Sequence, residues 1–488
     1  MEIKINSKIN KSTLIVPVFE QEDLKTKLLD VCKLIGFDQW SYFDDFKGKA
    51  KENCLFITSS GEKGYFLGLG KNREQAVIKN TFRSFFYTKK EKLNGTVRVL
   101  LSHENLEEFA SSISNGIALA NYNLGAQKKK EPSKSWFLEN AILDFQTDLN
   151  NDTLIIEFEK GIALAKTQMK IMEWVDAPSN YKTPRMISDW IKESGKEYGF
   201  EVKIFDNNIC VDLGLKALVA VGKGSVENPP IFVLMEYSHP EASKTIGLIG
   251  KGVTFDTGGV SLKPGDNMNY MKCDMGGAAA VVGAIEMAAK LKLMINIVAA
   301  VPLTENCIDS LAIKPGDVIG SYSGKTIEVI NTDAEGRLIL ADALSYVKKN
   351  YNPDILIDLA TLTGNCIQSL GYAAAALLSN NDDLANAILA SGQKTGEKTW
   401  RMPLWDDYKD MMKSDVADIK NLSSAPVAGA ITAAKFLEEF IDGHTSWAHL
   451  DIAGVAFGDS EYSSMKSATG YGVQLLVDFI ENNIASNK

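Results

Sequence analysis

Short apolar runs alternate with amphipathic stretches over the first third of the chain. The runs are rich in β-branched and aromatic residues, which favours strands, and the stretches repeat apolar residues at intervals of three and four, which favours helices. The predicted strands are Thr13–Phe19, Cys54–Thr58, Gly64–Leu69, Thr96–Leu101 and Thr153–Glu159. The predicted helices include Glu22–Ile35, Glu74–Phe86 and Asn105–Leu124. This order predicts an α/β domain over residues 1–160.

A longer helix is predicted where this first domain ends. Its pattern runs from Lys160 to Asp176 and stops at Ala177, because the residue before Pro178 is pushed out of the α region. We take residues 161–178 as a helix that connects two domains.

Strands and helices alternate again from residue 179 almost to the end of the chain. The predicted strands are Val202–Phe205, Ile231–Glu236, Thr245–Gly250, Ile295–Val301, Asp354–Leu359 and Trp447–Ile452. The predicted helices include Arg185–Tyr198, Gly277–Leu291, Arg337–Lys349 and Ala430–Ile441. Strands separated by such helices imply a mostly parallel sheet flanked by helices on both faces. We therefore expect a two-domain α/β protein, with a smaller N-terminal domain and a larger C-terminal domain, residues 179–488.

The net charge is concentrated in the larger domain. The 488 residues hold 52 Lys and Arg against 62 Asp and Glu, a formal charge of −10. Residues 1–160 hold 23 Lys and Arg and 22 Asp and Glu. Residues 161–488 therefore hold 29 Lys and Arg and 40 Asp and Glu. This acidic total argues against a protein that mainly coats nucleic acid. The four histidines form no HExxH motif, so a catalytic metal would depend mostly on carboxylates.

Cysteine usage and hydropathy bear on the compartment. The six cysteines form no CxxC pair, which is typical of reduced thiols in a reducing compartment. The first residues lack the basic start and long apolar core of a secretory signal, and no stretch approaches the ~20 apolar residues of a membrane span. We expect a cytoplasmic protein without a membrane partner.

Two segments of the larger domain carry charged residues at predicted strand ends. They follow the strands Thr245–Gly250 and Thr326–Ile330. Together they supply two lysines, four carboxylates and one arginine: Lys251, Asp256, Lys263, Asp274, Asp333, Glu335 and Arg337. Four acids in one cleft repel one another, whereas two divalent cations ~3.5–4 Å apart would balance them and form a hydrolytic site. Asp333 and Glu335 lie two residues apart, so an extended backbone would direct both to one side.

Each of these residues also has an ordinary structural interpretation. Asp333 and Asp274 could cap the helices that follow them, and Asp256 could be a turn residue. Lys251 and Lys263 could be solvated or paired with an acid. A phosphate-binding loop at Lys251 is disfavoured, because a proline-bounded loop follows instead of a helix.

The motifs of the larger domain resemble the leucyl aminopeptidase family of dinuclear metallo-exopeptidases (cytosol aminopeptidases). Asn331–Leu338, NTDAEGRL, matches the signature octapeptide of that family without a mismatch. Further matches are the segments Lys251–Lys263, Asp274–Ala278, Lys314–Asp317, Ser323–Glu328, Asp358–Gly364, Ile431–Ala434 and Trp447–Gly454. The resemblance covers about residues 165–480, whereas residues 1–160 match only in outline.

The resemblance implies a set of metal ligands and catalytic residues. Asp256 and Glu335 would bridge two divalent ions, zinc or manganese, with magnesium or cobalt as further options. Lys251 and Asp274 would complete the tighter site, and Asp333 the more exchangeable one. The catalytic residues would be Lys263, which supports the developing oxyanion, and Arg337, which lies beside a bicarbonate that serves as general base.

The resemblance also implies the reaction and the assembly. A metal-bridging hydroxide would attack the first peptide bond of a substrate with a free amino terminus and release an amino acid, with leucine-like residues preferred. The pocket for the first side chain would be lined by Met271, Thr361, Leu362 and Ala453. Family members assemble as homohexamers, which we expect here. The chain departs from the family at Asp176, where an asparagine is usual.

Two other functions remain open from the sequence. Some family members also bind nucleic acid as architectural proteins, and the run Lys128–Lys130 in a near-neutral first domain allows this weakly, although a solvated loop is the favoured interpretation of the run. Nucleotide binding by the first α/β domain rests on fold analogy alone, which says little about function.

Overall fold

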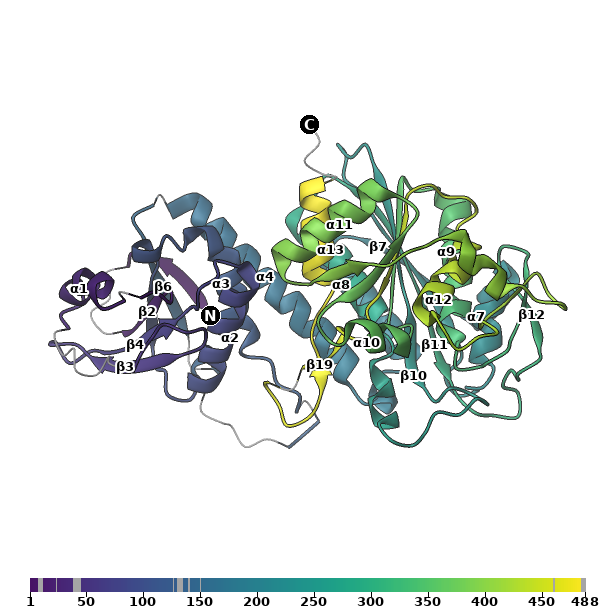
Figure 1. Ribbon diagram of the computed structural model, residues 1–488, viewed down its shortest axis with the longest axis horizontal. Coiled ribbons are helices and arrows are strands. Elements are labelled where there is room, and N and C mark those ends of the chain that lie inside the picture. Colours follow the sequence, from purple (N-terminus) through teal and green to yellow (C-terminus); the bar gives the residue numbers. More distant parts are fainter. Residues whose placement is uncertain are drawn as a thin grey trace. The chain divides into compact units, whose positions relative to one another are not determined.

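The computed structural model describes residues 1–7, 12–22, 24–37, 45–125, 127–129, 135–138, 141–149, 151–459 and 461–483. The chain divides into two compact units, Met1–Lys166 and Thr167–Lys488 (Figure 1). The lysine-rich loop expected over residues 128–134 lies mostly outside the described residues. Among the described residues, no helix is long and apolar enough to cross a membrane.

The sheet of the first unit is parallel except at one edge. Its strands are β1 (Glu2–Ile5), β2 (Thr13–Val18), β3 (Asn53–Ile57), β4 (Lys63–Gly68), β5 (Thr96–Leu100) and β6 (Ile142–Gln146). They pair in the order β1-β6-β5-β2-β4-β3, and β3 runs antiparallel to β4. The predicted strands over residues 13–101 are confirmed, whereas β1 and β6 were not predicted.

Helices cover both faces of this first sheet. They are α1 (Leu24–Leu34), α2 (Gln75–Lys89), α3 (Ala110–Leu119) and the start of α4 (Asn151–Asp176), with 3₁₀ turns at Ser102–Glu104, Glu107–Phe109 and Trp136–Leu138. Leu14 and Val16 of β2 pack in a cluster with α1, whereas Ile15 packs in a cluster with α2 and α3. This alternation is what a strand covered on both faces produces.

The predicted strand Thr153–Glu159 is wrong, because these residues form the first turns of α4. Leu154 and Phe158, four residues apart, both join the core of the first unit, and the Phe158 ring stacks on Phe145 at 3.6 Å. Their helical spacing outweighs the strand preference of the β-branched residues between them. The helix predicted over Asn105–Leu124 is also shorter, since 3₁₀ turns precede α3.

The second unit is built on a nine-stranded mixed sheet. Its strands are β7 (Glu201–Phe205), β8 (Ile231–Tyr237), β9 (Thr245–Gly250), β10 (Gly252–Asp256), β11 (Asn296–Asn306), β14 (Ile355–Ala360), β15 (Ala375–Ser379), β16 (Thr399–Arg401) and β18 (Trp447–Asp451). The order is β16-β15-β18-β14-β9-β11-β8-β7, with β10 beside β11. The central strands β18, β14, β9 and β11 run parallel, and β8 and β7 continue the sheet in antiparallel pairs.

Helices flank this sheet on both faces, as the sequence predicts (Figure 1). They are α5 (Pro184–Tyr198), α6 (Asn207–Leu213), α7 (Lys216–Gly222), α8 (Gly276–Leu291), α9 (Glu335–Tyr351), α10 (Gly364–Leu370), α11 (Asp382–Thr395), α12 (Gly429–Glu438) and α13 (Val473–Asn483). The helices α8 and α9 both pack on the central strands, and α8 packs with α5 and α13 whereas α9 packs with α7 and α12. The two-domain α/β fold class is confirmed.

The second unit also contains smaller elements outside the nine-stranded sheet. Two short sheets are formed by β12 (Val318–Gly320), β13 (Thr326–Glu328) and β17 (Ile419–Lys420), and by β19 (Phe457–Asp459) and β20 (Ser467–Ala468). The 3₁₀ helices of this unit are η5 (Ser179–Tyr181), η6 (Met268–Cys273) and η7 (Asp406–Met412).

The start of α8 lies directly against the ends of β9 and β14. The amide of Ala278 donates to the carbonyl of Lys251 at 2.9 Å, and the amide of Lys251 donates to the carbonyl of Leu359 at 3.0 Å. A Cβ atom on Gly277 would lie 2.0 Å from the oxygen of Leu359, and one on Gly250 would lie 2.5 Å from the oxygen of Gly277. Only glycine permits so close an approach of helix and strands.

We expect Gly277→Ala to destabilise the second unit. Overpacking costs ~1–3 kcal/mol, and a clash with backbone atoms falls at the top of that range. This corresponds to a fall of about 5 °C or more in the thermal unfolding midpoint, measured by calorimetry. Gly364→Ala is the control, because a Cβ atom there meets nothing within 4 Å. Equal midpoints for the two variants would contradict the proposed role of the close approach.

Candidate metal centre and active site

The acidic residues singled out in the sequence lie close to the carboxyl end of β9, where Lys251 contacts two of them. Asp256 ends β10, and Asp274 lies two residues before the first residue of α8, Gly276. Asp333 follows β13, and Glu335 is the first residue of α9. Because β9, β11, β14 and β18 run parallel, their carboxyl ends meet at one edge of the sheet.

Lys251, the residue after β9, joins two of these acids. Its Nζ atom lies 2.8 Å from Oδ2 of Asp274 and 2.9 Å from Oε1 of Glu335, and its side chain is 4% exposed. The amine also donates to the carbonyl of Thr361 at 3.0 Å, and the Thr361 hydroxyl donates to Asp274 at 2.7 Å. Thr361, which the sequence assigned to a side-chain pocket, therefore also contacts two of the expected ligands.

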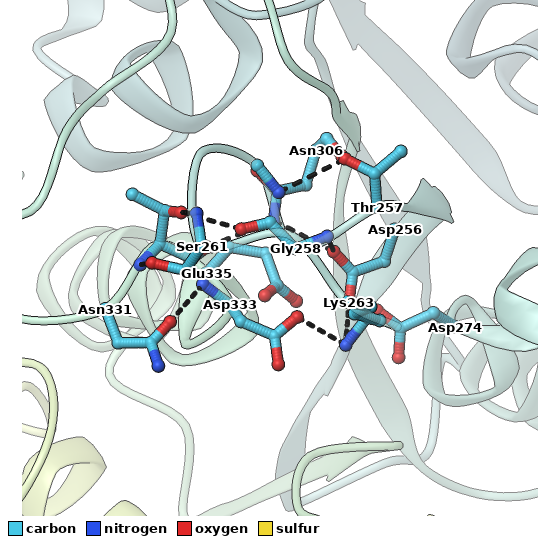
Figure 2. A network of polar contacts seen from close by, with 12 residues as sticks. Asp256, Thr257, Gly258, Ser261, Lys263, Asp274, Asn306, Asn331, Asp333 and Glu335 are labelled. Atoms are coloured by element: carbon cyan, nitrogen blue, oxygen red, sulfur yellow. Dashed lines mark hydrogen bonds and ion pairs between the residues drawn. The ribbon is translucent and has the colours of Figure 1, made fainter. Parts of the chain in front are cut away.

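Lys263 joins the other two acids (Figure 2). Its Nζ atom lies 2.8 Å from Oδ2 of Asp256 and 2.5 Å from Oδ1 of Asp333. The second oxygen of Asp256 accepts hydrogen bonds from the amide of Gly258 at 2.8 Å and from Nδ2 of Asn306 at 2.9 Å. Asp256 thus forms the turn contact that its structural interpretation requires and still presents one oxygen to the cluster.

The backbone between Asp333 and Glu335 differs from the extended conformation that we predicted. Asp333 lies in a turn, its amide donates to Oδ1 of Asn331 at 2.7 Å, and Glu335 already belongs to α9. Neither Asp333 nor Asp274 caps a helix, because the N-cap positions are Ala334 and Met275, without side-chain caps. The two carboxylates converge through a turn and a helix start instead of through strand alternation.

Buried polar side chains fix the loop that carries Asp333. Nδ2 of Asn306 donates to the carbonyl of Thr332 at 3.0 Å as well as to Asp256. Ser261 and Thr332 exchange two hydrogen bonds between amide and hydroxyl, at 2.8 and 3.1 Å. Asn306 was not predicted from the sequence, although its place at the end of β11 is a signal that could have indicated it.

Asn421 forms further hydrogen bonds with the segment that carries Asp333 and Glu335. Its Oδ1 atom accepts from the amide of Ile330 at 2.8 Å, and its Nδ2 atom donates to the carbonyl of Asn331 at 2.7 Å. Its own carbonyl accepts from Arg337 at 2.8 Å. Asn421 follows the short strand β17 far along the chain, so no spacing in the sequence relates it to this segment.

Burial raises the pKa values of three acids of the cluster, Asp274, Asp333 and Glu335. It is the largest cause for Glu335, where the charge of Asp256 adds to it, and for Asp274, where Lys251 opposes it. Burial lowers the pKa of Lys251, but the charges of Asp274 and Glu335 outweigh this effect and raise it above its usual value. Two lysines compensate only part of the charge of four acids, which favours binding of a further cation.

The arrangement of the acids fits a divalent metal. One oxygen from each of Asp256, Asp333 and Glu335 lies within 4.8 Å of the others. Glu335 is 1% exposed, and its Oε2 atom has no hydrogen-bond partner among the described residues. A buried carboxylate oxygen without a partner is costly unless a cation satisfies it. Oxygen-rich sites of this kind suit hard divalent ions.

Arg337 lies in the first turn of α9 and is 5% exposed. One of its terminal nitrogens donates to the carbonyl of Asn421, while its Nε atom has no hydrogen-bond partner in the described part of the chain. Burial lowers the pKa of the guanidinium to about 10, against the raising effect of Glu335. The side chain therefore remains a cation near neutral pH with a free donor, which suits a small anion.

Asp451, at the end of β18, joins two segments that carry expected pocket residues. Its Oδ1 atom accepts from the amides of Leu362 at 3.1 Å and Ala453 at 3.2 Å, and its Oδ2 atom accepts from the hydroxyl of Thr363 at 2.6 Å. Met271 lies apart from them in the sequence, in η6. Asp451 was not assigned a role from the sequence, although it belongs to a matched motif.

A second network of buried polar side chains lies on the face of β18 that carries Asp451. Asp358 of β14 accepts from Nε1 of Trp447 at 2.8 Å and lies 2.6 Å from Nδ1 of His449. Trp447, His449 and Asp451 are alternate residues of one strand, so their side chains share a face. This network anchors the strand whose end carries Asp451.

A family profile and the sequences of known proteins indicate the same family. The sequence profile described as "Cytosol aminopeptidase family, catalytic domain" matches residues 170–477. A probable cytosol aminopeptidase of Chlorobium limicola is 41% identical over 501 residues, covering 97% of each chain. A probable cytosol aminopeptidase of Geobacter sp. (strain M21) is 39% identical over 448 residues, covering 89% of each.

Solved structures resemble the chain over almost its whole length. A mutant of tomato leucine aminopeptidase superposes with a TM-score of 0.88 at 30% identity, covering 99% of this chain and 97% of that one. The cytosol aminopeptidase of Coxiella burnetii gives 0.85 at 29% identity, covering 99% of each. The bottromycin maturation enzyme BotP in complex with Mn gives 0.84 at 28% identity, covering 96% of this chain and 99% of that one.

We expect Asn306→Ala to weaken metal binding, because it removes the bonds that hold Asp256 and the backbone beside Asp333. Loss of a residue that orients a ligand typically costs about 10–100-fold in metal affinity. Calorimetric titration of the metal-free protein with Mn²⁺ measures the change. Asn482→Ala, on an exposed position of α13, is the control. An affinity equal to that of the control would show that Asn306 does not orient the acids.

Proposed function

Because the chain belongs to the cytosol aminopeptidase family, and is therefore a peptidase, we propose that it releases leucine-like residues from the amino termini of peptides in a metal-dependent reaction. The single observation that carries the proposal is the convergence of Asp256, Asp333 and Glu335 on one point beside two lysines. The manganese complex of BotP supports the use of a divalent metal.

We propose Lys251, Asp256, Asp274, Asp333 and Glu335 as the ligands of two divalent ions. Zinc or manganese fits best among the options, with magnesium or cobalt as alternatives. Bound metals would supply an activated water near neutral pH and polarise the scissile carbonyl. The buried Oε2 atom of Glu335, which lacks a protein partner among the described residues, supports its assignment as a ligand.

Lys263 is proposed to stabilise the charge that develops on the carbonyl oxygen. Its side chain is 22% exposed and that of Lys251 4%, so Lys263 can face a substrate as well as the acids. The charges of Asp256, Glu335 and Asp333 outweigh burial and raise its pKa, which keeps it protonated. A fixed cation beside the reacting carbonyl favours the transition state over the ground state.

Arg337 is proposed to hold a bicarbonate ion that accepts the proton of the attacking water. Its buried guanidinium, with an Nε donor that has no partner among the described residues, supports an anion at this position. The described part of the cluster contains no histidine, so a bound base would fill a role that its side chains do not.

Substrate selection is proposed to rest on the free amine and the first side chain. An internal peptide bond offers no free amine to the acidic cluster, which makes the enzyme an exopeptidase. Met271, Thr361, Leu362 and Ala453 are proposed to line the pocket, and Asp451 would hold Leu362 and Ala453 in place. We also propose a homohexamer and a cytosolic location, which the family supports; sedimentation velocity measures the assembly.

Hydrolysis of L-leucine p-nitroanilide tests the function. We expect activity that is lost on chelation and restored by Mn²⁺ or Zn²⁺, and no cleavage of the N-acetylated substrate. Lys263→Met should lower kcat by about 10²–10³-fold, and Glu335→Gln should also reduce bound metal. Lys413→Met, an exposed lysine paired with Asp410, is the control. Activity that survives chelation, or cleavage of the acetylated substrate, would contradict the proposal.

Bicarbonate dependence tests the role of Arg337. In degassed buffer, added bicarbonate should raise kcat of the wild type. The kcat of Arg337→Met should be lower by up to about 10-fold and should not change when bicarbonate is added, because the base is no longer held. Arg337→Lys keeps the charge and should respond partially. Metal content, measured in all three proteins, separates this effect from damage to the cluster. An Arg337→Met variant that responds like the wild type would exclude the role.

A further inference from the structure

Two lysines tie the end of α4 to the 3₁₀ helix η6. Nζ of Lys182 donates to the carbonyl of Val175 at 2.7 Å and to the carbonyl of Lys272. In return, Nζ of Lys272 donates to the carbonyl of Asp176 at 2.6 Å. The amine of Lys182 therefore bridges the two segments, and the amine of Lys272 joins them directly. We call these four residues the α4–η6 clamp.

The clamp satisfies groups that would otherwise be costly. The last carbonyls of a helix have no partner within the helix, and Val175 and Asp176 are the last two residues of α4. Lys182 is fully buried, so water cannot replace its amine. Both the charged and the neutral form of an amine carry enough N–H groups to donate to two carbonyls, so these bonds do not depend on its protonation.

The segment that the clamp holds carries two residues of the site. Met271 lies within η6 and Asp274 directly follows it. A 3₁₀ helix has poor hydrogen-bond geometry of its own, so its position depends on contacts with its surroundings. Here these include Tyr270, whose ring lies 5.6 Å from that of Phe457 in β19.

The side chain of Asp176 extends the same anchor to the neighbouring hairpin. Its Oδ1 atom accepts from the amide of Ala468 in β20 at 2.9 Å. This is the position at which the chain departs from the asparagine usual in the family, and an aspartate oxygen accepts this bond as an amide oxygen would. The end of α4 thus contacts both η6 and the hairpin that packs on it.

We propose that Lys182 and Lys272 are positioning residues that fix η6, and thereby set the selectivity of the enzyme for the first side chain of its substrate. The proposal rests on the proposed aminopeptidase function and on the assignment of Met271 to the pocket. Asp274 is held independently by Lys251 and Thr361. Loosening the clamp should therefore affect the pocket more than the metal centre.

The test compares Lys272→Met, Lys182→Met and Lys272→Arg with the wild type and with the surface control Lys413→Met. Hydrogen exchange at the amides of residues 268–273 should be about 10-fold faster or more in the two methionine variants, because local opening becomes easier. For L-leucine p-nitroanilide, KM should rise about 10-fold with kcat changed less than about 3-fold, and the preference over the alanine substrate should fall. Lys272→Arg keeps a hydrogen-bond donor, so its changes in hydrogen exchange and in KM should be smaller than those of Lys272→Met.

Each outcome bears on one part of the proposal. Unchanged exchange at residues 268–273 in Lys272→Met would overturn the clamp itself. Faster exchange with an unchanged preference between the leucine and alanine substrates, or a loss of metal at constant KM, would overturn its role in selectivity. If Lys182→Met fails to fold, the partly exposed Lys272 carries the test. If the wild type cleaves neither substrate, the proposed function fails, while the exchange comparison still tests the clamp.

Discussion

Mutual repulsion among four carboxylates is the constraint on which the second unit depends. Asp256, Asp274, Asp333 and Glu335 lie close together, and the two lysines between them balance only part of their charge. Burying such groups is costly unless each is paired and hydrogen-bonded. The cluster can persist because its neighbours supply fixed donors, from the amide of Gly258, the amide nitrogen of Asn306 and the hydroxyl of Thr361. The remaining deficit is the reason that a bound cation fits.

The sheet supplies the rigidity that this cluster needs. Its acids come from segments at the ends of parallel strands and at the first residues of two helices that are buried almost along their whole length. The contact of α8 with β9 and β14, which glycines at 250 and 277 permit, fixes the backbone of Lys251 on both sides. A side chain at either glycine would move that lysine and both acids that it joins. The positions of the charged side chains in the site therefore depend on the glycine packing of α8 against β9 and β14.

The sequence could predict the elements and the charged residues, but not how the backbone brings them together. Period and spacing indicated the central strands β9, β14 and β18, because such buried runs have few alternative structures. They failed at Thr153–Glu159, where β-branched residues suggested a strand and the spacing of Leu154 and Phe158 in the core required a helix. The convergence of Asp333 and Glu335 was expected for the wrong reason, since a turn replaces the extended backbone.

Supporting residues escaped prediction for a different physical reason. Asn306 and Asn421 act through hydrogen bonds to backbone atoms distant in the chain, and such bonds leave no periodic pattern in a sequence. Asp451 contacts two segments in the same way, through the amides of Leu362 and Ala453. Sequence patterns alone predict the charged residues at strand ends. The residues that orient these charged side chains are identified only from the contacts in the tertiary structure.

With Met271 in the proposed pocket, the chemistry and the selectivity of the site would rest on separate supports. The acids are attached to strand ends and helix starts, whereas Met271 lies on η6, a short 3₁₀ helix held from outside by Lys182 and Lys272. Because η6 contributes little hydrogen bonding of its own, changes in its anchors shift it at low cost. The acidic cluster resists such shifts, since each acid has contacts that do not involve the anchors. On the proposed assignment, such a protein could alter which side chain it accepts while its reactive centre stays unchanged.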